Sequence, residues 1–192
     1  MRICVYCGSS AGRLPAYAAA ARDLGALLAS RGIGLVYGGG NVGLMGIVAD
    51  AALAGGGEVI GVIPRALVDR ELAHRGVTEL RITESMHTRK QLMHDLSDAF
   101  IALPGGFGTL DELFETLTWA QLGVHTKPTG LLDVDGFWQP LVRLLESQVA
   151  AELLRPQHAA MLLHSTSGED LLAQFAAYTP PSLTKWVDRE QT

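Results

Sequence analysis

AFIALPGGFGTLDELFE, residues 99–115, joins a short apolar run to an amphipathic run through a glycine-rich turn. Residues 99–103 are few and apolar, which is typical of a buried strand, and residues 110–122 have the apolar spacing of a helix. A strand that leads through a short turn into a helix is the repeating unit of a parallel sheet covered by helices. This stretch therefore predicts an α/β fold.

The same alternation of strand and helix candidates runs through the rest of the chain. The predicted strands lie at 3–6, 34–37, 59–63, 79–83, 99–103 and 129–133. The predicted helices lie at 15–30, 42–54, 85–96, 110–122, 137–150 and 171–177. Together they predict a Rossmann-like, three-layer α/β architecture, in which a parallel sheet carries helices on both faces.

The composition indicates a single domain with a sizeable core. Of the 192 residues, 48% are hydrophobic and 18% are charged. We expect one nucleotide-binding α/β domain over residues 1–179 and a polar tail at 180–192, which begins at the Pro180 and Pro181 pair. The formal net charge is −5 and no basic block is present, so a nucleic-acid partner is not expected.

Three further features concern the cellular location. Residues 32–49 carry no charge, but they include seven glycines and Asn41 and would make a poor lipid-facing helix. The apolar run near residue 1 is too short for a signal peptide. Cys4 and Cys7 are separated by an odd interval, which on a strand points them to opposite faces, as expected of ordinary buried cysteines. We expect a cytoplasmic protein without membrane contact.

Glycine-bearing turns follow three of the predicted strands: CGSS at 7–10, YGGGNVGLMG at 37–46 and PGGFGT at 104–109. Ligands of parallel α/β sheets bind outside the carboxyl ends of the strands, and a helix N-terminus attracts anions. The turns therefore predict a site for a small anionic ligand. Gly38, Gly40 and Gly43 also spell the G-x-G-x-x-G of dinucleotide-binding enzymes, but the acidic Glu58 begins the next strand instead of ending it. A dinucleotide-binding enzyme is the weaker alternative.

Three carboxylates lie near the start of the helix that follows PGGFGT: Asp111, Glu112 and Glu115. Thr109 and Glu112 have the spacing of a capping box, which would be a purely structural role. Arg89 and Lys90, in a helix for which Ser85 is the expected N-cap, can instead bring two cations to these carboxylates and to a phosphate. The spacing alone leaves both roles open.

The segments MHTRK at 86–90, PGGFGTLDE at 104–112 and TWAQLGVHTKPTGLLDVDGFW at 118–138 resemble the Lonely Guy family of cytokinin riboside 5′-monophosphate phosphoribohydrolases, often mislabelled lysine decarboxylases. The family pattern P-G-G-x-G-T-x-x-E falls on residues 104–112, and its paired arginine falls on Arg89. The resemblance extends to about Tyr178. The sequence departs from the family at Thr88, Phe107 and Asp111, where Glu or Gln, Tyr and Glu are common.

The resemblance implies hydrolysis of the N-glycosidic bond of N6-modified adenosine 5′-monophosphates, with AMP as a further candidate, to free base and ribose 5-phosphate. Arg89 and Glu112 would be the catalytic residues, with Arg89 either keeping Glu112 ionised or donating to the leaving base, and the first amides of the following helix would hold the phosphate. A homodimer is also implied. By resemblance Lys90 would contact the phosphate and Glu71 the sugar or base. The full set of substrate contacts would be Glu71, Arg89, Lys90, Gly105, Gly106, Phe107, Gly108, Thr109, Leu110, Asp111, Glu112 and Thr118.

Neither a cofactor nor a metal is expected. Pyridoxal phosphate needs a lysine deep in its site, and of the three lysines in the chain only Lys90 is near the glycine turns. His87 and His94 share a helix face without a third ligand, so we expect a pair on the helix surface or at an interface.

A non-catalytic nucleotide carrier or sensor remains the other alternative, because a fold does not determine a function. Such a protein would use the same phosphate loop but would not need Arg89 and Glu112 as a pair.

Overall fold

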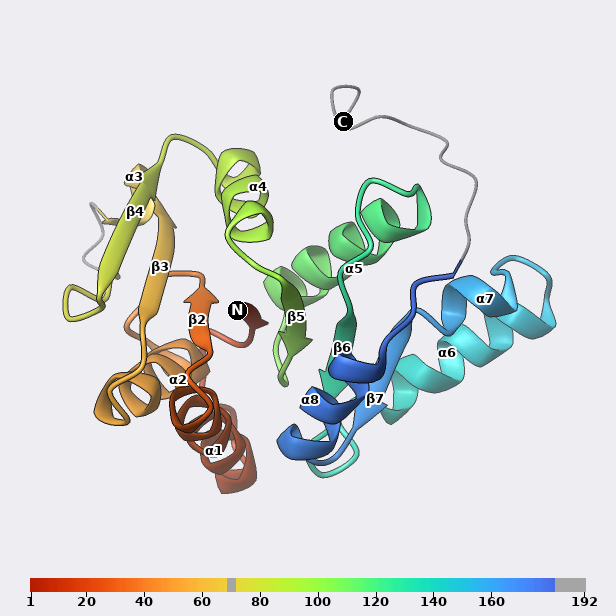
Figure 1. Ribbon diagram of the computed structural model, residues 1–192, viewed down its shortest axis with the longest axis horizontal. Helices are drawn as coiled ribbons and strands as arrows, with labels where there is room; N and C mark the ends of the chain where they lie inside the picture. The colour runs from red at the N-terminus through yellow and green to blue at the C-terminus, as the bar shows by residue number, and fades with distance from the viewer. Residues whose placement is uncertain (69–71, 182–192) are drawn as a thin grey trace.

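The computed structural model describes residues 1–68 and 72–181 (Figure 1). Within them seven parallel strands form one sheet in the order β4-β3-β2-β1-β5-β6-β7. The strands are β1 (Arg2–Tyr6), β2 (Gly34–Tyr37), β3 (Val59–Pro64), β4 (Glu79–Thr83), β5 (Ala99–Ala102), β6 (Thr129–Leu132) and β7 (Leu162–Ser165). The helices are α1 (Pro15–Ser30), α2 (Gly43–Ala54), α3 (Arg65–Val68), α4 (Met86–Asp95), α5 (Phe107–Gln121), α6 (Gln139–Ala150), α7 (Pro156–Ala159) and α8 (Gly168–Ala177).

The parallel sheet is the middle of three layers, as predicted. Its central strands are apolar and buried except for Arg2 at the start of β1, as expected where helices cover both faces of a sheet (Figure 1). Ile3 and Val5 of β1 face a core shared with α1, α2 and α8, whereas Cys4 and Tyr6 face the opposite core, shared with α4, α5 and α6. Cys4 and Cys7 are buried free thiols on opposite faces, which confirms the expectation from their spacing.

The strand order places a topological switch point between β1 and β5. From β1 the chain adds β2, β3 and β4 outward on one side, and then it returns to pair β5 with the other edge of β1. In the register, Ile3 lies beside both Leu35 and Ala99. The loops that follow β1, β2 and β5 therefore leave the same edge of the sheet, where a ligand crevice is expected.

The start of α5 differs from the sequence prediction. The helix begins at Phe107 with Gly106 as N-cap, three residues earlier than expected. Thr109 therefore lies inside the first turn and not at the cap, so the predicted capping box with Glu112 is wrong. The predicted cap of α4 is confirmed, because the Ser85 hydroxyl accepts a hydrogen bond from the Thr88 amide at 3.1 Å.

Other differences concern short or partly buried elements. The one-turn helices α3 and α7 were not predicted because four residues are too few to show helical spacing, and β7 was not predicted because it has only two apolar residues. The surface placement expected for His94 is wrong: its side chain is buried and stacks on the Phe100 ring, with a centroid separation of 5.2 Å. His87 is exposed, as expected. Residues 182–192 of the predicted tail lie outside the described residues, and the domain boundary at 179 stays a prediction.

Candidate active site

Arg89 of α4 and Glu112 of α5 form a buried ion pair at the carboxyl edge of the sheet. Arg89 Nη1 lies 3.0 Å from Glu112 Oε1, and each side chain is only 9% exposed. Two backbone carbonyls hold the same guanidinium: Arg89 Nε donates to the Val62 carbonyl at 3.0 Å and Nη2 donates to the Gly38 carbonyl at 3.3 Å. The ends of β2 and β3 thus fix the arginine that faces Glu112.

The glycine turn after β2 makes room for this arginine. A Cβ atom at Gly38 would lie 2.0 Å from Arg89 Nη2, so any side chain there would displace the guanidinium. Gly43 has a φ of +58°, and its Cβ would lie 2.3 Å from the Ser9 backbone in the loop after β1. Contacts within the chain therefore explain why the first and last residues of the G-x-G-x-x-G pattern are glycines. The pattern does not require a bound dinucleotide.

The glycines at the N-terminus of α5 face open space, unlike Gly38 and Gly43. A Cβ atom at Gly106 or Gly108 would meet nothing within 4 Å, and neither residue has a positive φ. The fold of the described residues does not require glycine at these two positions, whereas at Gly105 a Cβ would lie 2.0 Å from the Thr109 hydroxyl. The first amides of a helix have no intrahelical acceptor and carry the positive end of its dipole. This bare helix start is suited to an anion that approaches closely.

A hollow of about 300 Å³ lies beside this helix start, between the loops that follow β1 and β5. It occupies the topological switch point predicted from the strand order. Gly105 and Gly106 line one side. Other lining residues are Gly8, Ser9, Ser10, Tyr17 and Phe137.

Burial controls the protonation of the groups around Glu112. Burial raises the pKa of the Glu112 carboxyl, the adjacent Arg89 guanidinium opposes that rise, and Asp111 adds to it. Burial also raises the pKa of the Cys4 and Cys7 thiols and of the Tyr6 phenol, and the Glu112 charge raises all three further. These three groups stay protonated at neutral pH, so none of them supplies an anionic nucleophile.

The other residues predicted to contact the substrate differ in their exposure and in their distance along the chain from the Arg89 and Glu112 pair. Phe107 is 93% exposed at the first position of α5, whereas Leu110 packs against the core beneath that helix. Lys90 contacts Asp111 and Glu115 across the α4 and α5 pair. Thr118 is not brought to the site: it is exposed two turns along α5, where its hydroxyl donates to the Phe114 carbonyl at 2.6 Å. Glu71 lies outside the described residues.

Several groups at the site were not predicted from the sequence. The Gly38 and Val62 carbonyls that hold Arg89 have no side-chain signal, because backbone acceptors exist at every position. Tyr17 and Phe137 come from helical and loop positions far apart in the sequence, and only the fold brings them to the same hollow. The CGSS turn was recognisable, although no residue of it was included among the predicted contacts.

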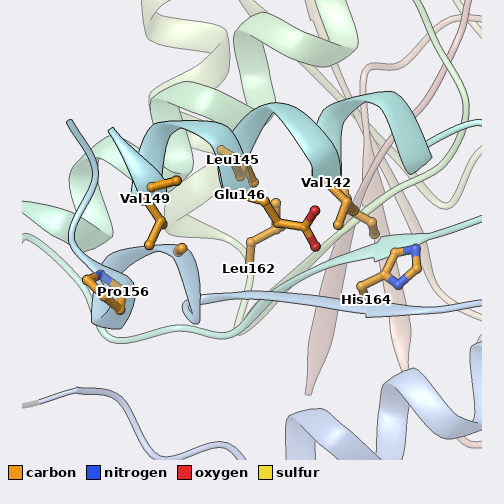
Figure 2. Close-up of a pocket in the computed structure, with 10 residues that line it drawn as sticks. Val142, Leu145, Glu146, Val149, Pro156, Leu162 and His164 are labelled. Carbon is orange, nitrogen blue, oxygen red and sulfur yellow. The ribbon is translucent and has the colours of Figure 1, made fainter. Parts of the chain in front are cut away.

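A second hollow of about 450 Å³ has a different character. It lies between α6, α7 and β7, where Val142, Leu145 and Val149 of α6 face Leu162 (Figure 2). Its lining is almost entirely apolar and includes none of the predicted site residues. Across residues 1–68 and 72–181, no three His, Cys, Asp or Glu side chains cluster in a way that could hold a metal ion.

Comparisons of sequence agree with one another. The family model described as possible lysine decarboxylase matches residues 45–175. The cytokinin riboside 5′-monophosphate phosphoribohydrolase LOG of Oryza sativa subsp. japonica is 48% identical over 179 residues, which are 93% of this chain and 74% of the rice protein. The cytokinin riboside 5′-monophosphate phosphoribohydrolase LOG3 of Arabidopsis thaliana is 49% identical, over 93% of this chain and 83% of that protein.

Solved structures share the fold at lower identity. The molybdenum cofactor binding protein of Rippkaea orientalis is 26% identical with a TM-score of 0.69, over 92% of this chain and 95% of that one. The molybdenum cofactor carrier protein of Chlamydomonas reinhardtii is 22% identical with a TM-score of 0.70, over 92% and 98% of the two chains. The latter likeness concerns the fold alone.

Proposed function

Because this chain belongs to the Lonely Guy family, whose family model is described as possible lysine decarboxylase, we propose that it hydrolyses the N-glycosidic bond of N6-modified adenosine 5′-monophosphates. The products are the free base and ribose 5-phosphate, and AMP is a further candidate substrate. The observation that carries the proposal is the buried Arg89 and Glu112 pair beside a bare helix start. A phosphate site and a carboxylate in adjacent positions are what this reaction requires.

The 5′-phosphate is held at the start of α5. The amides of Gly106, Gly108 and Thr109 donate to its oxygens, because these residues form the N-cap and first turn of the helix. Glu112, one turn further along, then lies close to the ribose. The hollow between the loops after β1 and β5 adjoins this phosphate position at Gly105 and Gly106, but neither Arg89 nor Glu112 lines it.

Glu112 acts as a carboxylate on the sugar. Cleavage of the N-glycosidic bond leaves positive charge on the ribose ring, and a nearby carboxylate stabilises that charge and orients the attacking water. Arg89 pairs with Glu112 and lowers its pKa, which favours the ionised form despite the burial. The two backbone acceptors of Arg89 support this pairing role, because they hold the guanidinium against Glu112.

Lysine decarboxylation is not supported by the lysines that the structure describes. A Schiff base with pyridoxal phosphate needs a lysine amine that can be freed in the site. Lys90 Nζ contacts two carboxylates, and Lys127 Nζ donates to the His94 carbonyl at 2.7 Å. Neither amine is placed for such a bond.

The test of the proposed function is product analysis with the purified protein. It is incubated with AMP and with a panel of N6-alkylated AMP analogues, and free base is separated from nucleotide by chromatography. Base release confirms the hydrolase and orders the substituents. Binding without base release would favour a carrier, the alternative to which the likeness to the Rippkaea orientalis protein points.

Alanine in place of Gly108 is expected to separate stability from activity. In the first turn of α5 the new methyl group meets no atom of the chain, so the helix gains up to about 1 kcal/mol and the melting temperature holds or rises. The same methyl group intrudes on the phosphate, so KM for AMP rises by roughly tenfold. Thermal melts and steady-state kinetics measure both effects.

Gly168→Ala is the control for the kinetics alone, because Gly168 opens α8 away from the site but its new Cβ would lie 3.0 Å from Leu27 Cδ2, which affects the melting temperature. Its kinetics are expected to equal those of the wild type. An unchanged KM in Gly108→Ala would place the phosphate elsewhere.

We also propose a cytoplasmic homodimer that binds neither nucleic acid nor membrane. None of the described helices is long and apolar enough to cross a bilayer. In the apolar segment 118–124 only Ala120 is buried, and elsewhere Phe107 and Leu153 are 93% and 82% exposed. Exposed apolar side chains of this size favour association. Light scattering at micromolar concentration is expected to give twice the chain mass, and the mass of one chain would refute the dimer.

A further inference from the structure

We infer that Lys90 is a positioning residue for the Arg89 and Glu112 pair and that it does not contact the substrate phosphate. The inference rests on the proposed function, and it changes the role that the family resemblance implies for this lysine. It follows from the partners of Lys90, from the charge balance around it and from the places of those partners on α5.

The ammonium group of Lys90 is already occupied by carboxylates. Its Nζ lies 3.0 Å from Glu115 Oε1, 3.1 Å from Asp111 Oδ2 and 3.3 Å from Asp111 Oδ1. A lysine ammonium has three N–H donors, and these contacts can use all of them. The Lys90 side chain is only 12% exposed, which leaves little room for another partner.

The local charge balance also opposes a phosphate contact. Arg89 and Lys90 are two cations, and they face three carboxylates on α5: Asp111, Glu112 and Glu115. The cluster therefore carries a net negative charge when all five groups are ionised. A phosphate brought to Lys90 would be repelled by two carboxylates within contact distance of the same ammonium. The start of α5 has no such excess of carboxylates among its first three residues.

The ion pairs of Lys90 with Asp111 and Glu115 fix the position of α5 against α4. Asp111 and Glu115 are four residues apart and share one face of the helix, so Lys90 holds two successive turns at once. Glu112 follows Asp111 directly, and Arg89 precedes Lys90 on α4. Fixing the rotation of α5 against α4 through Lys90 thus fixes the direction in which the Glu112 carboxylate points.

Lys90 also acts on the charge of Glu112. The charged and titratable groups facing Glu112 are Arg89 and Lys90 from α4, Asp111 on its own helix, and Cys4, Tyr6 and Cys7 from the β1 side. Arg89 and Lys90 lower the Glu112 pKa, whereas Asp111 raises it. Loss of the Lys90 charge would therefore move the ionisation of Glu112 to higher pH.

The kinetic test compares Lys90→Met with Lys90→Arg, which keeps the charge. For Lys90→Met we expect kcat to fall by roughly tenfold, with KM for AMP within about twofold of the wild type. The acidic limb of the kcat profile moves to higher pH, and the preference for AMP over adenosine is unchanged. Lys90→Arg recovers most of the activity. A raised KM with unchanged kcat and a reduced preference for AMP would overturn the inference.

The double variant Asp111→Asn/Glu115→Gln separates the two roles by the sign of its effect. If Lys90 positions Glu112, loss of its partners lowers kcat and leaves KM unchanged. If Lys90 binds phosphate, the same change frees the ammonium and removes two repelling charges, so KM falls. Melting temperatures close to that of the wild type establish that each variant is folded.

A binding measurement keeps this inference separate from the proposed function. Calorimetry with AMP in the Glu112→Gln background needs no turnover and is informative even if the wild type releases no base. Addition of Lys90→Met is expected to leave the AMP dissociation constant within about twofold. A weakening of tenfold or more would show a phosphate contact, whatever reaction the protein performs.

Discussion

Glutamine in place of Glu112 is expected to lower kcat by roughly 100-fold or more, the effect of losing one group that stabilises charge in the transition state. The amide has nearly the shape of the carboxylate and can still accept from Arg89, but it cannot stabilise a cationic sugar. The buried pair therefore keeps its packing, with both side chains 9% exposed in the wild type. The melting temperature is expected to fall by only a few degrees.

Comparing Glu112→Gln with the wild type also distinguishes a catalytic role of Glu112 from a helix-capping role. The N-cap of α5 is Gly106, so Glu112 has no capping role that glutamine could preserve or lose. Glu146→Gln is the matched control, because Glu146 lies on α6 beside the apolar hollow (Figure 2). It is expected to retain full activity. Wild-type kcat in Glu112→Gln would rule out the mechanism.

Removal of Arg89 should reproduce part of this loss. Arg89→Ala leaves Glu112 buried without its cation, so fewer Glu112 side chains are ionised at a given pH. If the two residues act as a unit, the double variant costs less than the sum of the two single changes. In the wild type, activity should rise with pH as Glu112 deprotonates, and burial places that rise above the ordinary pKa of a glutamate.

Adenosine is expected to be a far poorer substrate than AMP, by at least about 100-fold in kcat/KM. The 5′-phosphate gains several hydrogen bonds from the first amides of α5, and a hydrogen bond to a charged group contributes about 1.5–3 kcal/mol. Adenosine lacks these bonds, so the reacting ribose is not held against Glu112. Initial rates with the two compounds at several concentrations measure the ratio of the kcat/KM values. Equal values would show that the start of α5 does not bind the 5′-phosphate.

The fold was largely predictable because its strands are continuous apolar runs. Residues of β1, β2, β3 and β5 are buried on both faces, so each strand is marked by composition alone. β7 was missed because its two leucines are followed by His164 and Ser165, which gives neither an apolar run nor the alternation that marked the edge strand β4. The start of α5 was misplaced because a glycine N-cap has no side-chain signal and Thr109 imitates one.

The site was predictable in its residue types and in its charged pairs but not in its backbone partners. Arg89 and Glu112 were paired by family resemblance, and the structure brings them to 3.0 Å. The predicted meeting of Lys90 with the carboxylates of α5 is confirmed, whereas the backbone carbonyls that hold Arg89 depend on how α4 packs across the sheet. Sequence spacing does not encode that packing. Thr118 was included by resemblance alone, and in this chain its exposed hydroxyl donates to the Phe114 carbonyl of its own helix.

The most direct test of the central claim is to measure free base and ribose 5-phosphate together, in time courses with an N6-alkylated AMP. The wild type is expected to release the two products in equal amounts, and Glu112→Gln is expected to release both at least about 100-fold more slowly. Nucleotide binding without either product, or equal rates in the two proteins, would contradict hydrolysis at the Arg89 and Glu112 pair.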